Sequence, residues 1–267
     1  MRNFFLPFFA LIFFAEVSFA GLPFATDDAA IVHPNQLLIE TYTETWHLPA
    51  AHGVSAGDTL GQYAGFSYGV KNNLEVAFGA MAAYDFTGNN PSFANPFIQL
   101  KTIVYQAKKP EIPTLAISGG LVGKSGKGLY YDTANNAYLL GIATSKFFDE
   151  DLIIHFNLGN KSSFAVNGHN NIERTHLGIA FDLAVIGKDV RIFAESYNGS
   201  PNSPRDSPGY FHSYQFGLKW VRLGDVSFNI LYGSQPTFLG YGEGQESFYR
   251  RSNWVQFGMR KAFDDIF

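Results

Sequence analysis

Charged and histidine side chains recur on strand-like stretches of this sequence, and they are the residues whose types and spacing could do chemistry. Large apolar residues alternate there with small or polar ones, and the ionisable residues fall on the polar side. A dry interior would penalise such charges unless they were paired, whereas a hydrated lumen would accommodate them and let them select solutes. The residues expected to line such a lumen are Glu75, Asp85, His155, His176, Asp182, Arg191, Glu195, Lys219 and Arg260.

Two other interpretations of these residues stay open. In the first, the interior is closed and its charges only pair with one another, as Arg191 would with Glu195 on the same strand face. In the second, the chain is a hydrolase that needs a nucleophile within hydrogen-bond reach of its base. The side chains available for that role are His155, His176, Asp182 and Ser213. Because no nucleophile motif surrounds them, the sequence does not favour an enzyme.

Composition and motifs argue against several other chemistries. Cysteine is absent, which removes thiolate metal sites, disulfides and cysteine nucleophiles. The histidines show no ligand spacing beside a carboxylate. The stretch GGLVGKSGKG at 119–128 is one residue short of the phosphate-binding spacing, and Tyr-Tyr-Asp follows where a helix should begin. A net charge of -4 without a basic tract disfavours nucleic acid. We therefore expect no cofactor, no metal and no nucleic-acid partner.

The elements that must position the charged residues are β-strands. From Gly21 onward, period-2 alternation recurs and amphipathic helical spacing does not. The strands are expected near 36–47, 60–70, 74–86, 97–107, 114–122, 137–147, 152–160, 174–186, 190–197, 211–222, 226–233 and 253–263.

The connections between these stretches alternate in length. Short turns such as Lys71-Asn72-Asn73 follow every second stretch, and longer loops follow the others, for example 88–96, 123–136 and 234–252. This is the arrangement of an all-β, up-and-down antiparallel transmembrane barrel of about twelve strands in a bacterial outer membrane. On this fold, Phe78 of the hairpin YGVKNNLEVAFG (68–79) faces lipid and Glu75 faces the lumen.

Both ends of the chain fit export to that membrane. Residues 1–20 combine an arginine, an apolar run too short to span a bilayer and small residues before a cleavage point, which predicts a cleaved signal peptide. Residues 21–35 are then a periplasmic N-terminal segment, and residues 36–267 form the barrel. The last strand ends in aromatic residues, with Phe263 or Phe267 in the terminal position. The expected partners are outer-membrane lipid, the barrel assembly machinery through this strand, and small solutes.

Four stretches resemble a known family, the MetA-pathway-of-phenol-degradation family of outer-membrane β-barrel proteins. They are GLPFATDDAAIV (21–32), YGVKNNLEVAFG (68–79), KFFDEDLIIHFNLG (146–159) and the closing FGMRKAF (257–263), with Glu40 in the first strand. The resemblance implies uptake of aromatic or other hydrophobic compounds and supplies no catalytic residues. The expected function is a channel or transporter for small solutes. A non-conducting structural or surface-binding barrel is the alternative, and an outer-membrane hydrolase is less favoured.

Overall fold

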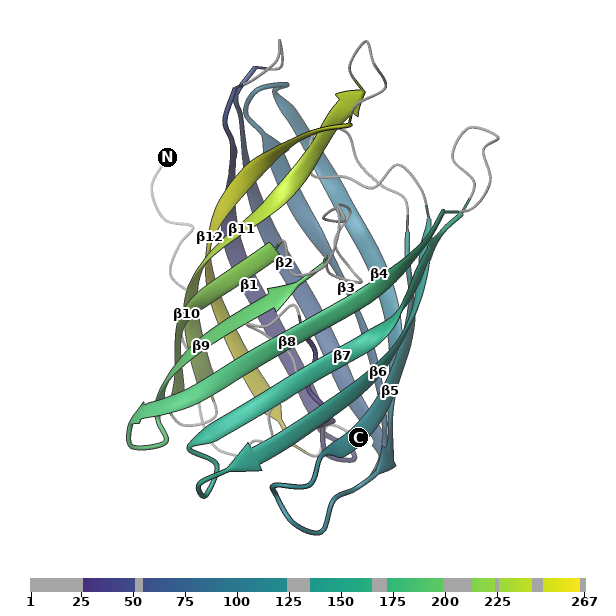
Figure 1. Ribbon diagram of the computed structural model, residues 1–267, viewed down its shortest axis with the longest axis vertical. Coiled ribbons are helices and arrows are strands. Elements are labelled where there is room, and N and C mark those ends of the chain that lie inside the picture. Colours follow the sequence, from purple (N-terminus) through teal and green to yellow (C-terminus); the bar gives the residue numbers. More distant parts are fainter. Residues whose placement is uncertain are drawn as a thin grey trace, which may run out of the picture.

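The strands form a closed antiparallel barrel of twelve members, seen in a computed structural model (Figure 1). The structure describes residues 26–50, 55–123, 135–164, 172–198, 213–223, 226–241 and 247–264. Within these ranges no helix is long and apolar enough to cross a membrane. The strands are β1 (Leu37–Leu48), β2 (Gly57–Lys71), β3 (Leu74–Asp85), β4 (Asn90–Tyr105), β5 (Thr114–Val122), β6 (Asn136–Phe147), β7 (Leu152–Ser163), β8 (Ile172–Ile186), β9 (Val190–Tyr197), β10 (Ser213–Leu223), β11 (Val226–Tyr241) and β12 (Ser247–Phe263).

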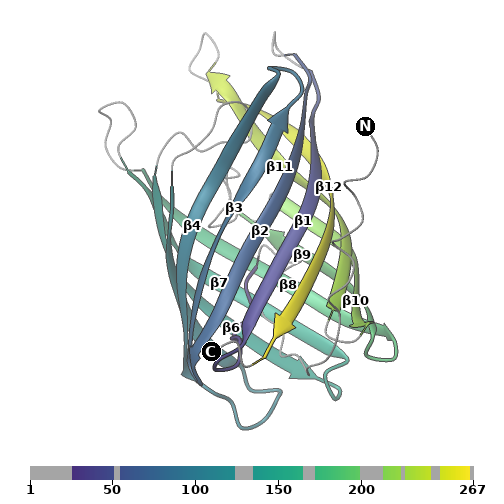
Figure 2. The ribbon, with the colours of Figure 1, turned by 180° about the vertical axis from the view of Figure 1, so that it is seen from behind.

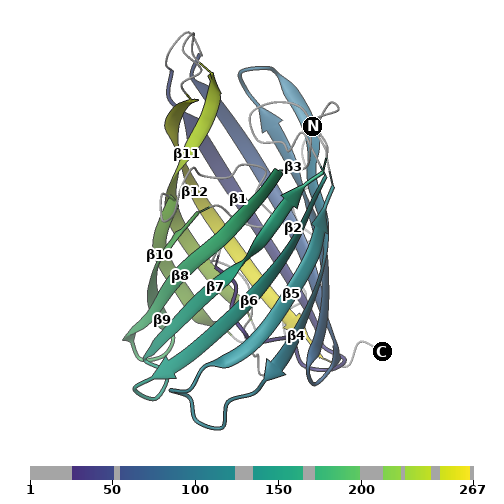
Figure 3. The ribbon, with the colours of Figure 1, turned by 45° about the vertical axis from the view of Figure 1, so that its right-hand side comes forward.

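Strand order around the barrel follows chain order, which makes the topology up-and-down. The first and last strands pair antiparallel from Leu37 opposite Phe263 to His47 opposite Asn253, and this seam closes the barrel. Closure leaves neither the first nor the last strand as an open edge of the sheet. Figures 2 and 3 show the strands tilted around one common axis. The prediction of a twelve-stranded antiparallel barrel is therefore confirmed.

Alternating side chains give the wall an apolar outer face and a polar inner face. In the hairpin of β2 and β3, Phe78 is 51% exposed on the outside, whereas Glu75 is 3% exposed on the inside. The same alternation places Leu158 outward and Asn157 inward on β7, and Leu218 outward and Lys219 inward on β10. Since successive side chains of a strand point to opposite faces, the period of the sequence decides this arrangement.

Two of the expected long loops are largely strand. β4 begins at Asn90, so most of 88–96 belongs to it, while β11 and β12 take up most of 234–252. Prolines obscured these extensions in the sequence, because proline is rare inside strands except at edges and bulges. Pro91 pairs opposite Tyr84, and Pro236 opposite Arg251. The β11 extension contains a register shift, and the β4 extension lies opposite one in β3. A bulge at a register shift tolerates proline.

Short turns mark one end of the barrel, called here the turn end, and the opposite end is the loop end. Asn72 and Asn73 join β2 to β3 at the turn end, as expected. The β6–β7 turn holds Phe148, Asp149 and Glu150 in left-handed backbone conformations, with φ of 52°, 54° and 70°. Lys188 Nζ of the β8–β9 turn lies 2.7 Å from Asp149 Oδ2 and so joins the two neighbouring turns.

Some sequence-based predictions fall outside the described residues. These are the signal peptide over residues 1–20, the central part of the 123–136 loop, most of the glycine-rich stretch after Gly123, and Phe267. They remain predictions. Gly119 to Val122, the start of the glycine-rich stretch, form the end of β5.

Residues 26–36 precede β1 and run inside the barrel at its turn end (Figure 1). The sequence led us to expect residues 21–35 as a separate periplasmic segment. In the structure, Thr26, Ala29 and Val32 are fully buried against the inner wall. The reason is that the inner wall offers side-chain acceptors to backbone N–H groups of this stretch. We call residues 26–36 the inner segment.

Candidate functional site

Most buried charges of the inner wall lie in the half of their strand nearest the turn end, and three pairs of neighbouring strands supply most of these. Glu40 lies directly opposite Arg260 in the β1–β12 pair, and Glu75 opposite Lys101 in the β3–β4 pair. Arg191 and Lys219 oppose each other in the β9–β10 pair. We call these residues, with Asp182 of β8, the charged layer. Directly opposed side chains are close enough to interact, so the register itself builds this layer.

The members of the charged layer pair with one another. Arg260 Nη2 lies 3.0 Å from Glu40 Oε1. Arg191 Nε donates to Asp182 Oδ1, and Lys219 Nζ lies 3.7 Å from the other oxygen of that carboxylate. Ion pairing of this kind offsets the cost of removing the charges from water.

Arg191 does not take the partner considered from the sequence. Glu195 lies on the same face of β9 but four residues away, which is about 13 Å along a strand. Asp182 instead sits diagonally across the β8–β9 pair, because Arg191 is opposite Ala184. Glu195 accepts hydrogen bonds from Gln215 Nε2 and from the backbone of Thr26. A neighbouring strand therefore provides a nearer partner than the same strand does.

The charged layer is closed to water in this conformation. Lys101 and Arg260 are each 2% exposed, and Asp182 is 1% exposed. The sequence predicted a hydrated lumen around these charges, with a closed and internally paired barrel as the alternative. At this level the charges are paired and buried, and the inner segment contacts Glu75 and Lys101 of the layer.

The inner segment contacts the wall strand by strand. Val32 N donates to Glu75 Oε2 of β3 at 2.8 Å, and Ala29 N donates to Thr144 Oγ1 of β6 at 2.9 Å. Thr26 N donates to Glu195 Oε2 of β9 at 2.7 Å. The stretch thus follows the inner wall from β3 to β9 and bridges distant strands.

Asp27 forms the most extensive single contact of the inner segment. Its N–H donates to Asn157 Oδ1 at 2.7 Å, and Asn157 Nδ2 donates back to the Asp27 carbonyl at 2.8 Å. Its carboxylate lies 3.1 Å from Lys101 Nζ, which is also 3.9 Å from Glu75 Oε1. Lys101 therefore joins the inner segment to the charged layer.

Two glycines of the inner wall make room for the inner segment. A Cβ added at Gly69 of β2 would lie 1.9 Å from the His33 carbonyl oxygen, and one at Gly178 of β8 would lie 2.6 Å from Thr26 Oγ1. Any side chain at Gly69 would thus collide with backbone. The close approach of the segment requires glycine there.

Burial shifts the titration of one carboxyl of the inner segment. It raises the pKa of Asp28 to about 7, against the opposing effect of the Lys101 ammonium. The same carboxylate accepts a hydrogen bond from Ala30 N at 2.8 Å. The docked segment therefore favours a protonated Asp28 in the range where a free aspartate is ionised.

Aromatic rings line the lumen on the loop-end side of the charged layer. Tyr42 and Tyr63 stack with ring centroids 4.5 Å apart, and Trp46 and Trp254 stack at 4.4 Å. Phe97 continues the first stack at 6.2 Å from Tyr63. These five residues form what we call the aromatic layer. Tyr42 and Tyr63 pack against one buried cluster, and Trp254, which is 4% exposed, belongs to another.

All nine residues predicted to line a pore are buried on the inside of the barrel. Their roles differ, however. Asp85 lies at the loop end of β3, where its carboxylate accepts a hydrogen bond from Thr87 N at 3.0 Å and stabilises the following turn. His155 Nδ1 lies 3.0 Å from Thr144 Oγ1, and His176 is buried on β8. That these residues line a path for solute stays a prediction.

Sequence reasoning missed the residues that receive the inner segment. Lys101, Thr144 and Asn157 lie on inner faces of their strands and carry groups that pair well with backbone or carboxylate. Their place on polar strand faces was visible in the sequence. Their partners were not, because the N–H groups of Thr26, Ala29 and Val32 leave no residue-type signature.

The side chains considered for a hydrolase are divided along the barrel axis. His155 and Asp182 lie toward the turn end, whereas Ser213 is the first residue of β10 at the loop end. The Asp182 carboxylate is paired with Arg191 and Lys219. A carboxylate paired with two cations does not orient a histidine base, so Asp182 is not available to His155 for that role. His176 lies toward the loop end of β8, the end at which Ser213 lies on β10.

No known protein-family model matches the sequence, and no curated protein matches it. Solved structures do match. The COG4313 outer membrane channel from Pseudomonas putida F1 superposes with a TM-score of 0.61 and 6% identity, over 88% of this chain and 98% of that chain. The chain has the fold of that channel.

Two porins are more distant matches. The NanC porin gives a TM-score of 0.48 with 9% identity, over 84% of this chain and 98% of that one. The KdgM porin gives 0.46 with 12% identity, over 85% and 99%. At 6% identity the match to the COG4313 channel shows the fold alone and leaves the solute to be argued from this chain's own residues.

Proposed function

We propose that the protein is a bacterial outer-membrane channel for small solutes and that the inner segment holds it closed. The observation that carries this proposal is the polar attachment of residues 26–36 to walls as far apart as β3 and β9. Three features support the proposed outer-membrane location. They are the apolar outer face, the export signal expected in residues 1–20 and the fold shared with an outer membrane channel.

The attachment is of a kind that can be released. Residues 26–32 are held by hydrogen bonds between their backbone and wall side chains and by the Asp27 carboxylate, and water can replace each of these partners when the segment withdraws. A covalently continuous wall strand could not leave without breaking a row of ladder hydrogen bonds. The segment precedes β1, and its backbone joins β2 at Asn35 and Gln36, which bond the backbone of Gly69, so residues 26–33 are the part that withdraws.

The aromatic layer points to the solute class. A solute that reaches it from the loop end meets the stacked pairs Tyr42–Tyr63 and Trp46–Trp254 before the charged layer. Small aromatic or otherwise hydrophobic molecules gain most from contact with such rings. The resemblance to the MetA-pathway-of-phenol-degradation family supports the same class.

A non-conducting barrel is the second candidate function, and the low exposure of the charged layer favours it. Conductance separates the two. The protein lacking residues 26–36 should form ion-conducting pores in planar bilayers and let liposomes swell in small solutes, while the parent protein conducts far less. If heat modifiability shows that both proteins are folded and neither conducts, the channel proposal fails.

A further inference from the structure

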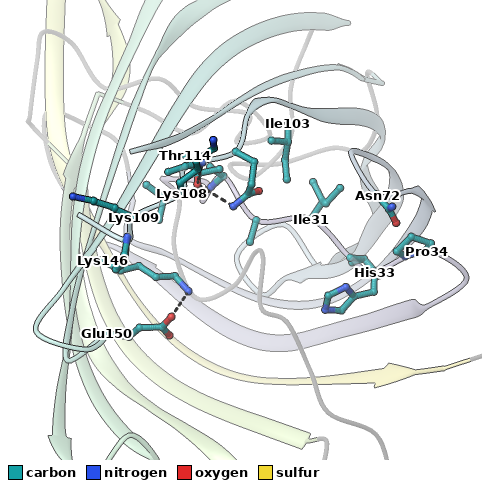
Figure 4. Close-up of a pocket in the computed structure, with 17 residues that line it drawn as sticks. Ile31, His33, Pro34, Asn72, Ile103, Lys108, Lys109, Thr114, Lys146 and Glu150 are labelled. Atoms are coloured by element: carbon teal, nitrogen blue, oxygen red, sulfur yellow. Dashed lines mark hydrogen bonds and ion pairs between the residues drawn. The ribbon is translucent and has the colours of Figure 1, made fainter. Parts of the chain in front are cut away.

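A cavity opens at the turn end, between the inner segment and the turns that follow β4 and β6. Its volume is about 630 Å³, within the range of pockets that hold small organic ligands. Residues 29–34 of the inner segment form one wall, and residues 106–110 of the β4–β5 connection form another. Figure 4 shows this space from close by.

The two sides of the cavity differ in chemistry. Lys108, Lys109 and Lys146 gather on one side, and Ile31 and Pro34 lie on the other (Figure 4). Further apolar surface comes from Ile103 and from alanines of the inner segment.

Positive charge is in excess around this cavity. Among its lining residues Glu150 is the one acid, and its Oε1 lies 2.9 Å from Lys146 Nζ. That pair is neutral as a whole. The ammonium groups of Lys108 and Lys109 therefore make the electrostatic potential in the cavity positive. Both lysines are exposed, so a ligand reaches them from the periplasmic side without first crossing the barrel.

We propose that this cavity binds small organic anions that carry an apolar body, of which an aromatic carboxylate is the simplest example. The carboxylate lies near Lys108 and Lys109, and the ring lies against Ile31 and Ile103. An anion without an apolar body lacks the binding free energy that comes from burying apolar surface. A neutral ring lacks the binding free energy that comes from attraction to the lysines. The role of this cavity in transport rests on the proposed function, in which a solute leaving the lumen emerges here. Binding of the anion to the cavity does not depend on that function.

The test is equilibrium binding to the purified full-length mature protein in a non-ionic detergent. The probes are 4-fluorobenzoate, its neutral counterpart 4-fluorobenzyl alcohol, and acetate as an anion without a ring. Fluorine NMR line widths, corrected with empty micelles, report the fluorinated probes, and competition reports acetate. We expect 4-fluorobenzoate to bind about tenfold or more tightly than either comparison, and its affinity to fall as ionic strength rises.

The double variant Lys108→Gln/Lys109→Gln should weaken 4-fluorobenzoate binding about fivefold or more, since it removes the uncompensated charge. Lys188→Gln is the matched control, because Lys188 is an exposed lysine of another turn. Equal affinity for the acid and the alcohol would overturn the proposal. So would an unchanged affinity in the double variant. Conductance is measured separately. If the double variant binds 4-fluorobenzoate as tightly as the parent protein, but removal of residues 26–36 still opens pores, the site is refuted and the proposed function stands.

Discussion

Replacing Lys101 by methionine should release the inner segment. Methionine preserves the length of the side chain but removes the charge that lies 3.1 Å from Asp27 and 3.9 Å from Glu75. Breaking a buried ion pair by removing one partner typically costs about 3–5 kcal/mol. Because the Asp27 side chain is 18% exposed, we take the lower end, about 3 kcal/mol, as the loss of docking free energy.

A loss of about 3 kcal/mol raises the undocked population roughly 100-fold. Thiol labelling measures that population directly, since the natural chain has no cysteine. Ala29 is fully buried, so a maleimide reaches the thiol of an Ala29→Cys variant only when the segment undocks. Labelling should be roughly 100-fold faster when Lys101→Met is added.

Two controls make this result interpretable. An exposed thiol introduced by Lys188→Cys should react at the same rate in both backgrounds. Lys101→Arg, which keeps the charge, should change labelling of the Ala29→Cys variant much less than Lys101→Met does. A rate that stays within about twofold after Lys101→Met would refute the role given to this lysine.

Three further predictions follow from the same geometry. Gly69→Val should speed labelling of the Ala29→Cys variant, because its Cβ would lie 1.9 Å from the His33 carbonyl oxygen; unchanged labelling would contradict this. Conductance should rise as pH increases from about 4 to about 7 and then level off, because docking raises the pKa of Asp28 from its usual 3.8 to about 7 and is strongest when this carboxyl is protonated. Asp28→Asn should flatten that profile, and a steep profile in this variant would exclude Asp28 as the titrating group. Phe78→Arg on the outer face should destabilise the inserted barrel by about 2–4 kcal/mol if it lies near the membrane midplane, as judged by urea unfolding in liposomes against Phe78→Leu.

The sequence was sufficient to predict the number of strands and the two faces of the wall. Both depend on local alternation, so Phe78 and Glu75 could be assigned to opposite faces from their neighbours alone. Strand lengths were less predictable. Pro91 and Pro236 lie inside strands near bulges, and the position of a bulge depends on the register of the neighbouring strand.

The interior of the barrel was predictable only in part. The buried charges were recognised as inner-face residues, but their pairing depends on which residues meet across strands, as Arg191 and Asp182 do. The inner segment was not foreseen at all. Its stretch Thr26-Asp27-Asp28-Ala29 has no strand or helix period, and its contacts join residues more than a hundred positions apart in the chain.

A disulfide that locks the inner segment would test the central claim most directly. A Cβ built at Gly178 of β8 would lie 3.5 Å from Thr26 Cβ, a separation that a disulfide spans, and the chain otherwise has no cysteine. The measurement is single-channel conductance of the Thr26→Cys/Gly178→Cys variant, first oxidised and then reduced in the same bilayer. We predict few or no openings while the disulfide is intact and recovery of openings after reduction, with each single variant unaffected by reductant. Equal conductance in the oxidised and reduced states would contradict the account.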